Sequence, residues 1–120
     1  MMVLVDTSVW IDHLHHVDAT LRAALEEGNV LTHPFVIGEL ACGNIRGRVE
    51  ILRLLGALPQ APVASNAEVL EFIERRQLMG RGIGFVDAHL LASMTLARSA
   101  RLLTTDRRLA AVAMELERGE

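Results

Sequence analysis

Residues 3–11 have the sequence Val-Leu-Val-Asp-Thr-Ser-Val-Trp-Ile, and this stretch decides how the chain begins to fold. Its first three residues form an apolar run, rich in β-branched side chains, that predicts a short buried strand. Asp6 follows at once, and Thr7 and Ser8 can cap the helix that the next apolar residues begin. We therefore expect a carboxylate just past the carboxyl end of a buried strand.

Strand and helix patterns alternate along the rest of the chain. Short apolar runs predict strands at 30–32 and 102–104 and an edge strand at 63–64. Longer patterned stretches predict helices at 18–27, 34–43, 48–55, 66–77, 85–99 and 107–117, with Asn66 as the cap of the helix at 66–77. This alternation is typical of an α/β domain, a parallel sheet with helices on both faces, whose ligands bind at the carboxyl ends of the strands. We expect a single domain over residues 1–120.

The composition narrows the class of protein. Hydrophobic residues make up 51% of the chain, which excludes disorder, and the net charge of −3 argues against a broadly basic surface that coats nucleic acid. The single Cys42 excludes an internal disulfide and a thiolate zinc cluster. The start of the chain lacks the basic segment and the long apolar stretch of a signal peptide or membrane span, so we expect a cytoplasmic protein with no membrane association.

Four carboxylates share an unusual context, because each is the only charged residue in an otherwise apolar segment or follows such a segment. Glu39 is the only charge in 34–43 and Asp87 the only charge in 83–97, while Asp6 and Asp106 each follow a predicted strand. The chain has no lysine, and an unpaired buried carboxylate is costly. We therefore expect the four to converge on a divalent cation. Oxygen ligands favour Mg²⁺ or Mn²⁺ over Zn²⁺, and such ions activate water for phosphodiester hydrolysis.

Each carboxylate also has a purely structural interpretation. Asp6, Asp87 and Asp106 can each cap a helix, and Glu39 can project from a helix rim. Taken singly, none is decisive, but isolated caps would rarely all fall at one end of one sheet. Aspartates at strand ends also occur in receiver domains and in haloacid-dehalogenase-type phosphatases. Both of those classes use a lysine, which this chain lacks.

These residues and their flanks resemble the PIN-domain nucleases, and most of all the VapC-type toxins of bacterial toxin–antitoxin pairs. The matching blocks, in order, are residues 5–11, 37–40, 82–92 and 103–109. The resemblance implies a three-layer α/β/α PIN-like fold with a central parallel sheet of four to five strands.

The same resemblance implies roles for particular side chains. The implied catalytic quartet consists of Asp6, Glu39, Asp87 and Asp106. Asp6 and Asp87 are its most direct metal ligands, while Glu39 and Asp106 bind the metal directly or through water. The hydroxyls of Ser8 and Thr104 are implied to hold the aspartates in place.

The implied activity is Mg²⁺-dependent endonucleolytic cleavage of RNA, with tRNA or other structured RNA as typical targets and Mn²⁺ as a substitute ion. The implied partners are a cognate antitoxin and a second copy of the chain, with operator DNA reached only through the antitoxin. Two alternatives remain open, a housekeeping PIN-type RNA-processing nuclease and a non-catalytic module that binds RNA or a partner. Arginines near the carboxyl edge of the sheet are suited to guide RNA phosphates, namely Arg46, Arg48, Arg81, Arg107 and Arg108.

Overall fold

A computed structural model describes residues 1–119 of the chain. The strands are β1 (Met2–Val5), β2 (Val30–Leu31) and β3 (Ala100–Leu103). The helices are α1 (Thr7–His15), α2 (Ala19–Glu26), α3 (Pro34–Cys42), α4 (Arg48–Gly56), α5 (Asn66–Arg76), α6 (Phe85–Leu96) and α7 (Arg107–Glu117). The expected alternation of strands and helices is confirmed, and the fold is α/β.

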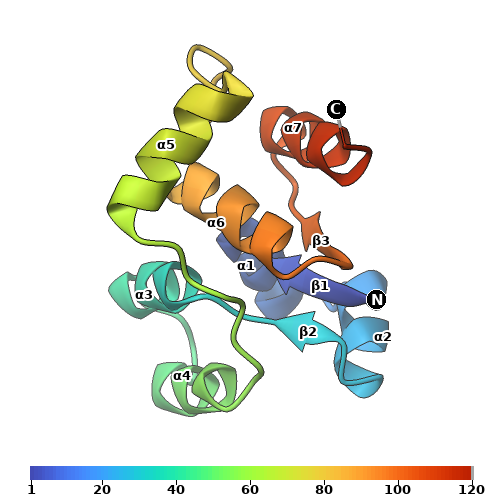
Figure 1. The fold of residues 1–120 in the computed structure, drawn as a ribbon. Helices are drawn as coiled ribbons and strands as arrows, with labels where there is room; N and C mark the ends of the chain where they lie inside the picture. The colour runs from blue at the N-terminus through green and yellow to red at the C-terminus, as the bar shows by residue number, and fades with distance from the viewer. Residues whose placement is uncertain (120) are drawn as a thin grey trace.

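The sheet is parallel and places the first strand of the chain in its centre. The strand order is β2-β1-β3, so β1 pairs on one side with β2 and on the other with β3 (Figure 1). Leu4 lies opposite Leu31 in one pair, and Val5 opposite Leu103 in the other. Because the strands run in the same direction, their carboxyl ends share one edge of the sheet, and Asp6 follows β1 at that edge.

Helices lie on both sides of this small sheet. In Figure 1, α6 crosses in front of the sheet and α1 lies behind it, while α5 packs against α6 at a distance from the strands. The core between these layers is aliphatic, as expected from a chain with so few aromatic residues. Fully buried side chains of this core include Leu4, Val5, Leu21, Val36, Leu90 and Leu109.

The sheet is smaller than expected, with three strands within residues 1–119 instead of four to five. The predicted edge strand at 63–64 is absent. In its place, the chain makes one isolated parallel bridge between Thr32 and Gln60. Pro59 and Pro62 flank this bridge and carry no backbone N–H, so a continuous ladder cannot extend along the segment.

The structure decides between the candidate caps of two helices. The cap of α5 is Ser65 rather than Asn66, because the Ser65 hydroxyl accepts from Glu68 N while the Glu68 carboxylate accepts from Ser65 N, a reciprocal capping box. The cap of α1 is Asp6 itself, which accepts from Thr7 N. In the part of the chain that the structure describes, no helix combines the length and the apolar character needed to cross a bilayer.

Candidate active site

Asp6 occupies the carboxyl end of the central strand and is almost fully buried, with 9% of its surface exposed. Its backbone N–H continues the ladder to Leu103 O at 2.9 Å, which fixes the residue against β3. One carboxylate oxygen, Oδ1, accepts from Thr7 N at 2.8 Å. The other, Oδ2, accepts from the hydroxyls of Thr104 at 2.7 Å and Ser8 at 3.4 Å. The carboxylate is therefore held from two strand ends at once.

The Thr104 hydroxyl also connects Asp6 to Asp106. While donating to Asp6, its oxygen accepts from Asp106 N at 3.1 Å. Asp106 is the cap of α7, and its Oδ1 accepts from the backbone N–H groups of Arg108 and Leu109 at 2.9 and 3.1 Å. The structure thus places Ser8 and Thr104 on the carboxylate of Asp6, and it places Asp106 beside that carboxylate through a shared hydroxyl.

Asp87 and Glu39 come to the same edge on two helices. Asp87 lies in the first turn of α6, half-buried, where its Oδ2 accepts from Gly84 N at 2.8 Å. Glu39 lies on α3 with an exposed side chain. One acid therefore comes from each of four segments: the end of β1, α3, α6 and the start of α7.

Glu39 and Asp87 each lie close enough to two other acids of the set to be affected by their charges. Burial raises the pKa of Glu39, and the negative charges of Asp6 and Asp87 raise it further, against a lowering by the nearby Thr7 hydroxyl. Burial likewise raises the pKa of Asp87, opposed by the Gly84 N–H and reinforced by the charges of Asp6 and Asp106. Like charges destabilise the ionised form of a carboxyl group, so full ionisation of this cluster is unfavourable without a neutralising cation.

The four carboxylates offer the kind of oxygen donors that a divalent cation prefers. Within residues 1–119, none of the four carboxylates forms an ion pair with an arginine or histidine. As the side chains stand, no three potential metal ligands among these residues lie close enough to chelate one ion together. However, the backbone N–H groups engage only Oδ2 of Asp87 and Oδ1 of Asp106, which leaves their other oxygens free. Capping and metal binding are therefore compatible at both residues.

A buried pair of histidines behind the site was not fully anticipated. His89 is buried on α6, and its Nε2 lies 2.9 Å from Asn66 Oδ1. His33 caps α3, since its Nδ1 accepts from Phe35 N at 3.0 Å, and its ring centroid lies 6.3 Å from that of His89. Neither His33 Nε2 nor His89 Nδ1 has a partner among the described residues. Sequence analysis missed His33, although a histidine before Pro34 is compatible with a cap.

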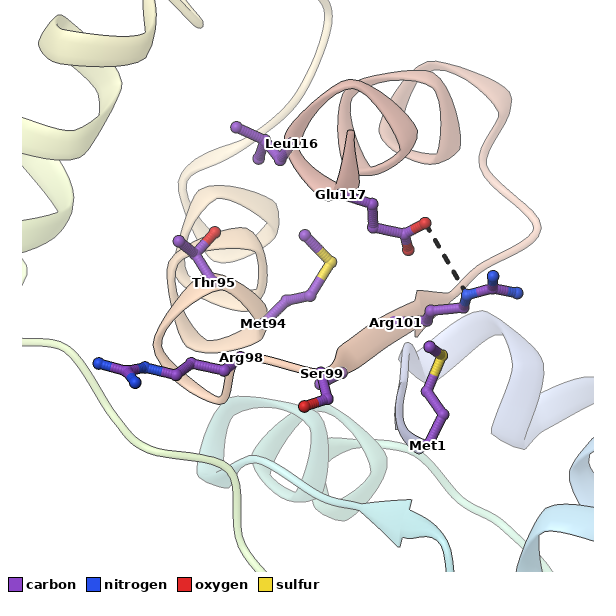
Figure 2. Close-up of a pocket in the computed structure, with 9 residues that line it drawn as sticks. Met1, Met94, Thr95, Arg98, Ser99, Arg101, Leu116 and Glu117 are labelled. Carbon is purple, nitrogen blue, oxygen red and sulfur yellow. Dashed lines mark ion pairs between the residues drawn. The ribbon is translucent and has the colours of Figure 1, made fainter. Parts of the chain in front are cut away.

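A separate hollow lies at the opposite edge of the sheet. It has a volume of about 370 Å³ and is lined by residues that include Met1, Met94 and Leu116 (Figure 2). Arg101 and Glu117 also line it, and Arg101 Nε lies 4.0 Å from Glu117 Oε2. Met1 and Arg101 lie where β1 and β3 begin, whereas ligands of parallel α/β sheets bind where the strands end. We assign this hollow no part in the site.

Comparison with known proteins agrees with this arrangement. Residues 3–115 match the PIN domain, which is almost the whole chain and includes all four carboxylates. The chain belongs to the PIN-domain family. Ribonuclease VapC32 from two strains of Mycobacterium tuberculosis, CDC 1551 / Oshkosh and ATCC 25618 / H37Rv, is in each case 51% identical over 114 residues. The match covers 95% of this chain and 92% of each relative.

Membership of this family agrees with the α/β fold and indicates a nuclease site. The resemblance to VapC-type PIN ribonucleases is confirmed, and with it the expectation of a nuclease-type hydrolase. PIN-domain ribonucleases generally use a divalent metal ion, which accords with a cluster of carboxylates that no arginine neutralises.

Proposed function

We propose that this chain, as a single nuclease domain, is a Mg²⁺-dependent endoribonuclease that acts as the toxin of a toxin–antitoxin pair. The observation that supports it most strongly is the acidic edge itself. The charges of Asp6 and Asp87 raise the pKa of Glu39, those of Asp6 and Asp106 raise the pKa of Asp87, and none of the four carboxylates forms an ion pair within residues 1–119. RNA is the substrate that the name of the VapC32 relatives indicates.

In this proposal the residues divide the work. Asp6 and Asp87 hold the metal most directly, since Asp6 is fixed by three hydrogen bonds and Asp87 by one. Bound Mg²⁺ supplies a more acidic water and neutralises charge on the phosphate. Asp106 binds the metal directly or through water. Glu39 is exposed and its pKa is raised, so its carboxylate is suited to orient the attacking water and to accept a proton from it.

The remaining elements of the proposal concern partners. VapC toxins pair with VapB antitoxins, and an apolar groove of about 320 Å³ between α1, α2 and α4 offers a surface for a partner helix. Its lining consists of Trp10, His13, Leu14, Leu25, Ile51, Leu54, Leu55 and Leu58. We also place the protein in the cytoplasm as a homodimer, with operator DNA reached only through the antitoxin.

The proposal is tested by a cleavage assay on bulk tRNA and rRNA with purified protein. Cleavage should require Mg²⁺ or Mn²⁺ and stop with a chelator, and Asp6→Asn and Asp87→Asn should each abolish it. Asp12→Asn is the matched control, because Asp12 is an exposed acid on α1, the helix that Asp6 caps. Full metal-dependent cleavage by both active-site variants would refute the assignment, and no cleavage by wild type would favour a binding module.

A growth assay separates a toxin from a housekeeping enzyme. Expression of the chain without its antitoxin should arrest growth, and co-expression of the small protein encoded beside it should restore growth. The Asp87→Asn variant should be harmless at the same expression level. Unimpaired growth with protein that is active in vitro would favour the housekeeping role.

A further inference from the structure

Two arginines lie at the amino end of a helix, where positive charge is unfavourable. Arg107 and Arg108 begin α7, and its first turn contains no acidic residue. The amino end of a helix carries a partial positive charge, so cations there are unfavourable. Both side chains are exposed, and the arrangement gives α7 no local electrostatic benefit. Such a placement suggests a use for the charges outside the helix.

Two of the arginines expected near this edge, Arg48 and Arg81, are already engaged. Both terminal nitrogens of Arg81 donate to Glu115, at 2.7 and 2.8 Å, and Arg48 donates twice to Ala41 O at the end of α3. By contrast, the guanidinium of Arg108 forms no ion pair or hydrogen bond within residues 1–119, since only its backbone N–H is bonded. Its five donors are therefore available to a ligand.

Gly82 leaves room for this unpaired side chain. A Cβ placed on Gly82 would stand 2.5 Å from Nη1 and 2.6 Å from Cδ of Arg108, so the arginine lies directly over the glycine backbone. Gly80 has a similar left-handed φ, 73° against 79°, but a Cβ there would meet nothing within 4 Å. The two glycines thus share a backbone conformation, and only Gly82 leaves room for the arginine.

The contact between Arg108 and Gly82 lies beside the acidic edge formed by Asp6, Glu39, Asp87 and Asp106. Arg108 is tied through its backbone N–H to Asp106, and its side chain covers the loop whose Gly84 N–H holds Asp87. Gly82 and Gly84 are two residues apart, so their Cα atoms are separated by at most about 7 Å. A guanidinium at this position is close to the cluster yet outside it.

We propose that Arg108 is a substrate-binding residue that grips the RNA phosphate next to the scissile one, and that Gly82 holds it in place by leaving it room. This inference deepens the proposed function and rests on it. An arginine fork matches the oxygens of a phosphate in geometry as well as in charge, whereas a lysine ammonium matches them in charge alone.

The decisive experiment measures binding apart from cleavage. Fluorescein-labelled oligo(U) is titrated with protein in the presence of a chelator at several salt concentrations, with fluorescence anisotropy as the readout. Arg108→Ala should weaken binding about tenfold and flatten the salt dependence by about 0.7 in log–log slope, as expected for one lost phosphate contact on a single strand. Arg108→Lys should keep the salt slope and lose part of the affinity.

Paired glycine variants test the contact between Arg108 and Gly82. Gly82→Ala should reproduce the Arg108→Ala defect, and it should add little in an Arg108→Ala background, because both changes remove one interaction. Gly80→Ala introduces the same backbone strain without touching the arginine and should bind as wild type does. In single-turnover cleavage of bulk tRNA with Mg²⁺, Arg108→Ala should raise the protein concentration needed for half-maximal rate more than it lowers the maximal rate.

Three outcomes would overturn the inference. They are wild-type affinity and salt slope in Arg108→Ala, an equal defect in Gly80→Ala and Gly82→Ala, and no measurable binding of oligo(U) by the wild type. Failure of the proposed function would appear elsewhere, as absence of Mg²⁺-dependent cleavage by a wild-type protein that still binds oligo(U) through Arg108.

Discussion

Lowering the pH through the range in which a histidine ordinarily takes up its proton should destabilise this protein, because His33 is buried in a position that opposes an imidazolium. Its side chain is 0% exposed. Burial, and next the nearby His89, lower its pKa from 6.5 to about 4. The hydrogen bond gives an independent reason: Nδ1 accepts from Phe35 N, and a proton on Nδ1 would set two donors against each other and remove the cap of α3.

The size of the effect follows from the two pKa values. The unfolded chain binds a proton at 6.5 and the folded chain only near 4, so the unfolded state binds more protons in between. The stabilising effect of the neutral ring is complete above 6.5 and is lost as the pH falls towards 4. At about 1.4 kcal/mol for each pKa unit, the loss in the free energy of unfolding is about 3 kcal/mol by pH 4.

Urea unfolding followed by fluorescence measures this loss, because Trp10 is the only tryptophan and is 5% exposed. His33→Asn is the informative variant, since an asparagine oxygen can still accept from Phe35 N but does not titrate. Its stability should fall with pH by about 3 kcal/mol less than that of the wild type. His16→Asn, at an exposed position, controls for loss of a histidine. Parallel stability–pH curves for wild type and His33→Asn would refute the reasoning.

Three further predictions concern the site and the core. Thr104→Val removes the hydroxyl that holds Asp6 and should weaken divalent-ion affinity about 10- to 100-fold in calorimetric titrations, while Thr104→Ser should restore it. Because the pKa values of Glu39 and Asp87 are raised, cleavage at subsaturating Mg²⁺ should decline with falling pH earlier than for ordinary carboxyls, and more Mg²⁺ should move the decline to lower pH; a decline independent of Mg²⁺ would contradict this. Leu21→Ala, at a fully buried position, should cost about 2–5 kcal/mol in urea unfolding, and a smaller loss would mean that the cavity collapses.

The position of the acidic edge could be predicted from sequence because it depends on local signals. A buried apolar run that stops at Asp6, and a second one that stops before Asp106, place both acids at strand ends whatever the details of packing. Parallel pairing then brings those ends together. Glu39 and Asp87 are lone charges in apolar helices, α3 and α6, and the charge of Asp6 raises the pKa of both.

The features that sequence analysis missed depend on contacts or on competition between neighbours. Ser65 and Asn66 are both good caps, and only the reciprocal bond with Glu68 decides between them. The role of His33 as a cap depends on its contact with Phe35 N, and its lowered pKa depends on burial and then on His89, which lies on a helix far away in the sequence. The extra strand expected at 63–64 is absent because Pro62, directly before it, has no backbone N–H to donate to a neighbouring strand.

The strand order has a consequence for the moment at which the acidic edge comes into existence. β1 leaves a ribosome before β3, and the Thr104 hydroxyl that holds Asp6 lies 98 positions further along the chain, just after β3. A nascent chain therefore carries Asp6 without the Thr104 hydroxyl and without Asp106 beside it until β3 has been made. Pairing over such a separation forms late and slowly. A chain with the proposed activity thus completes its acidic edge only after β3 has been synthesised and has paired with β1.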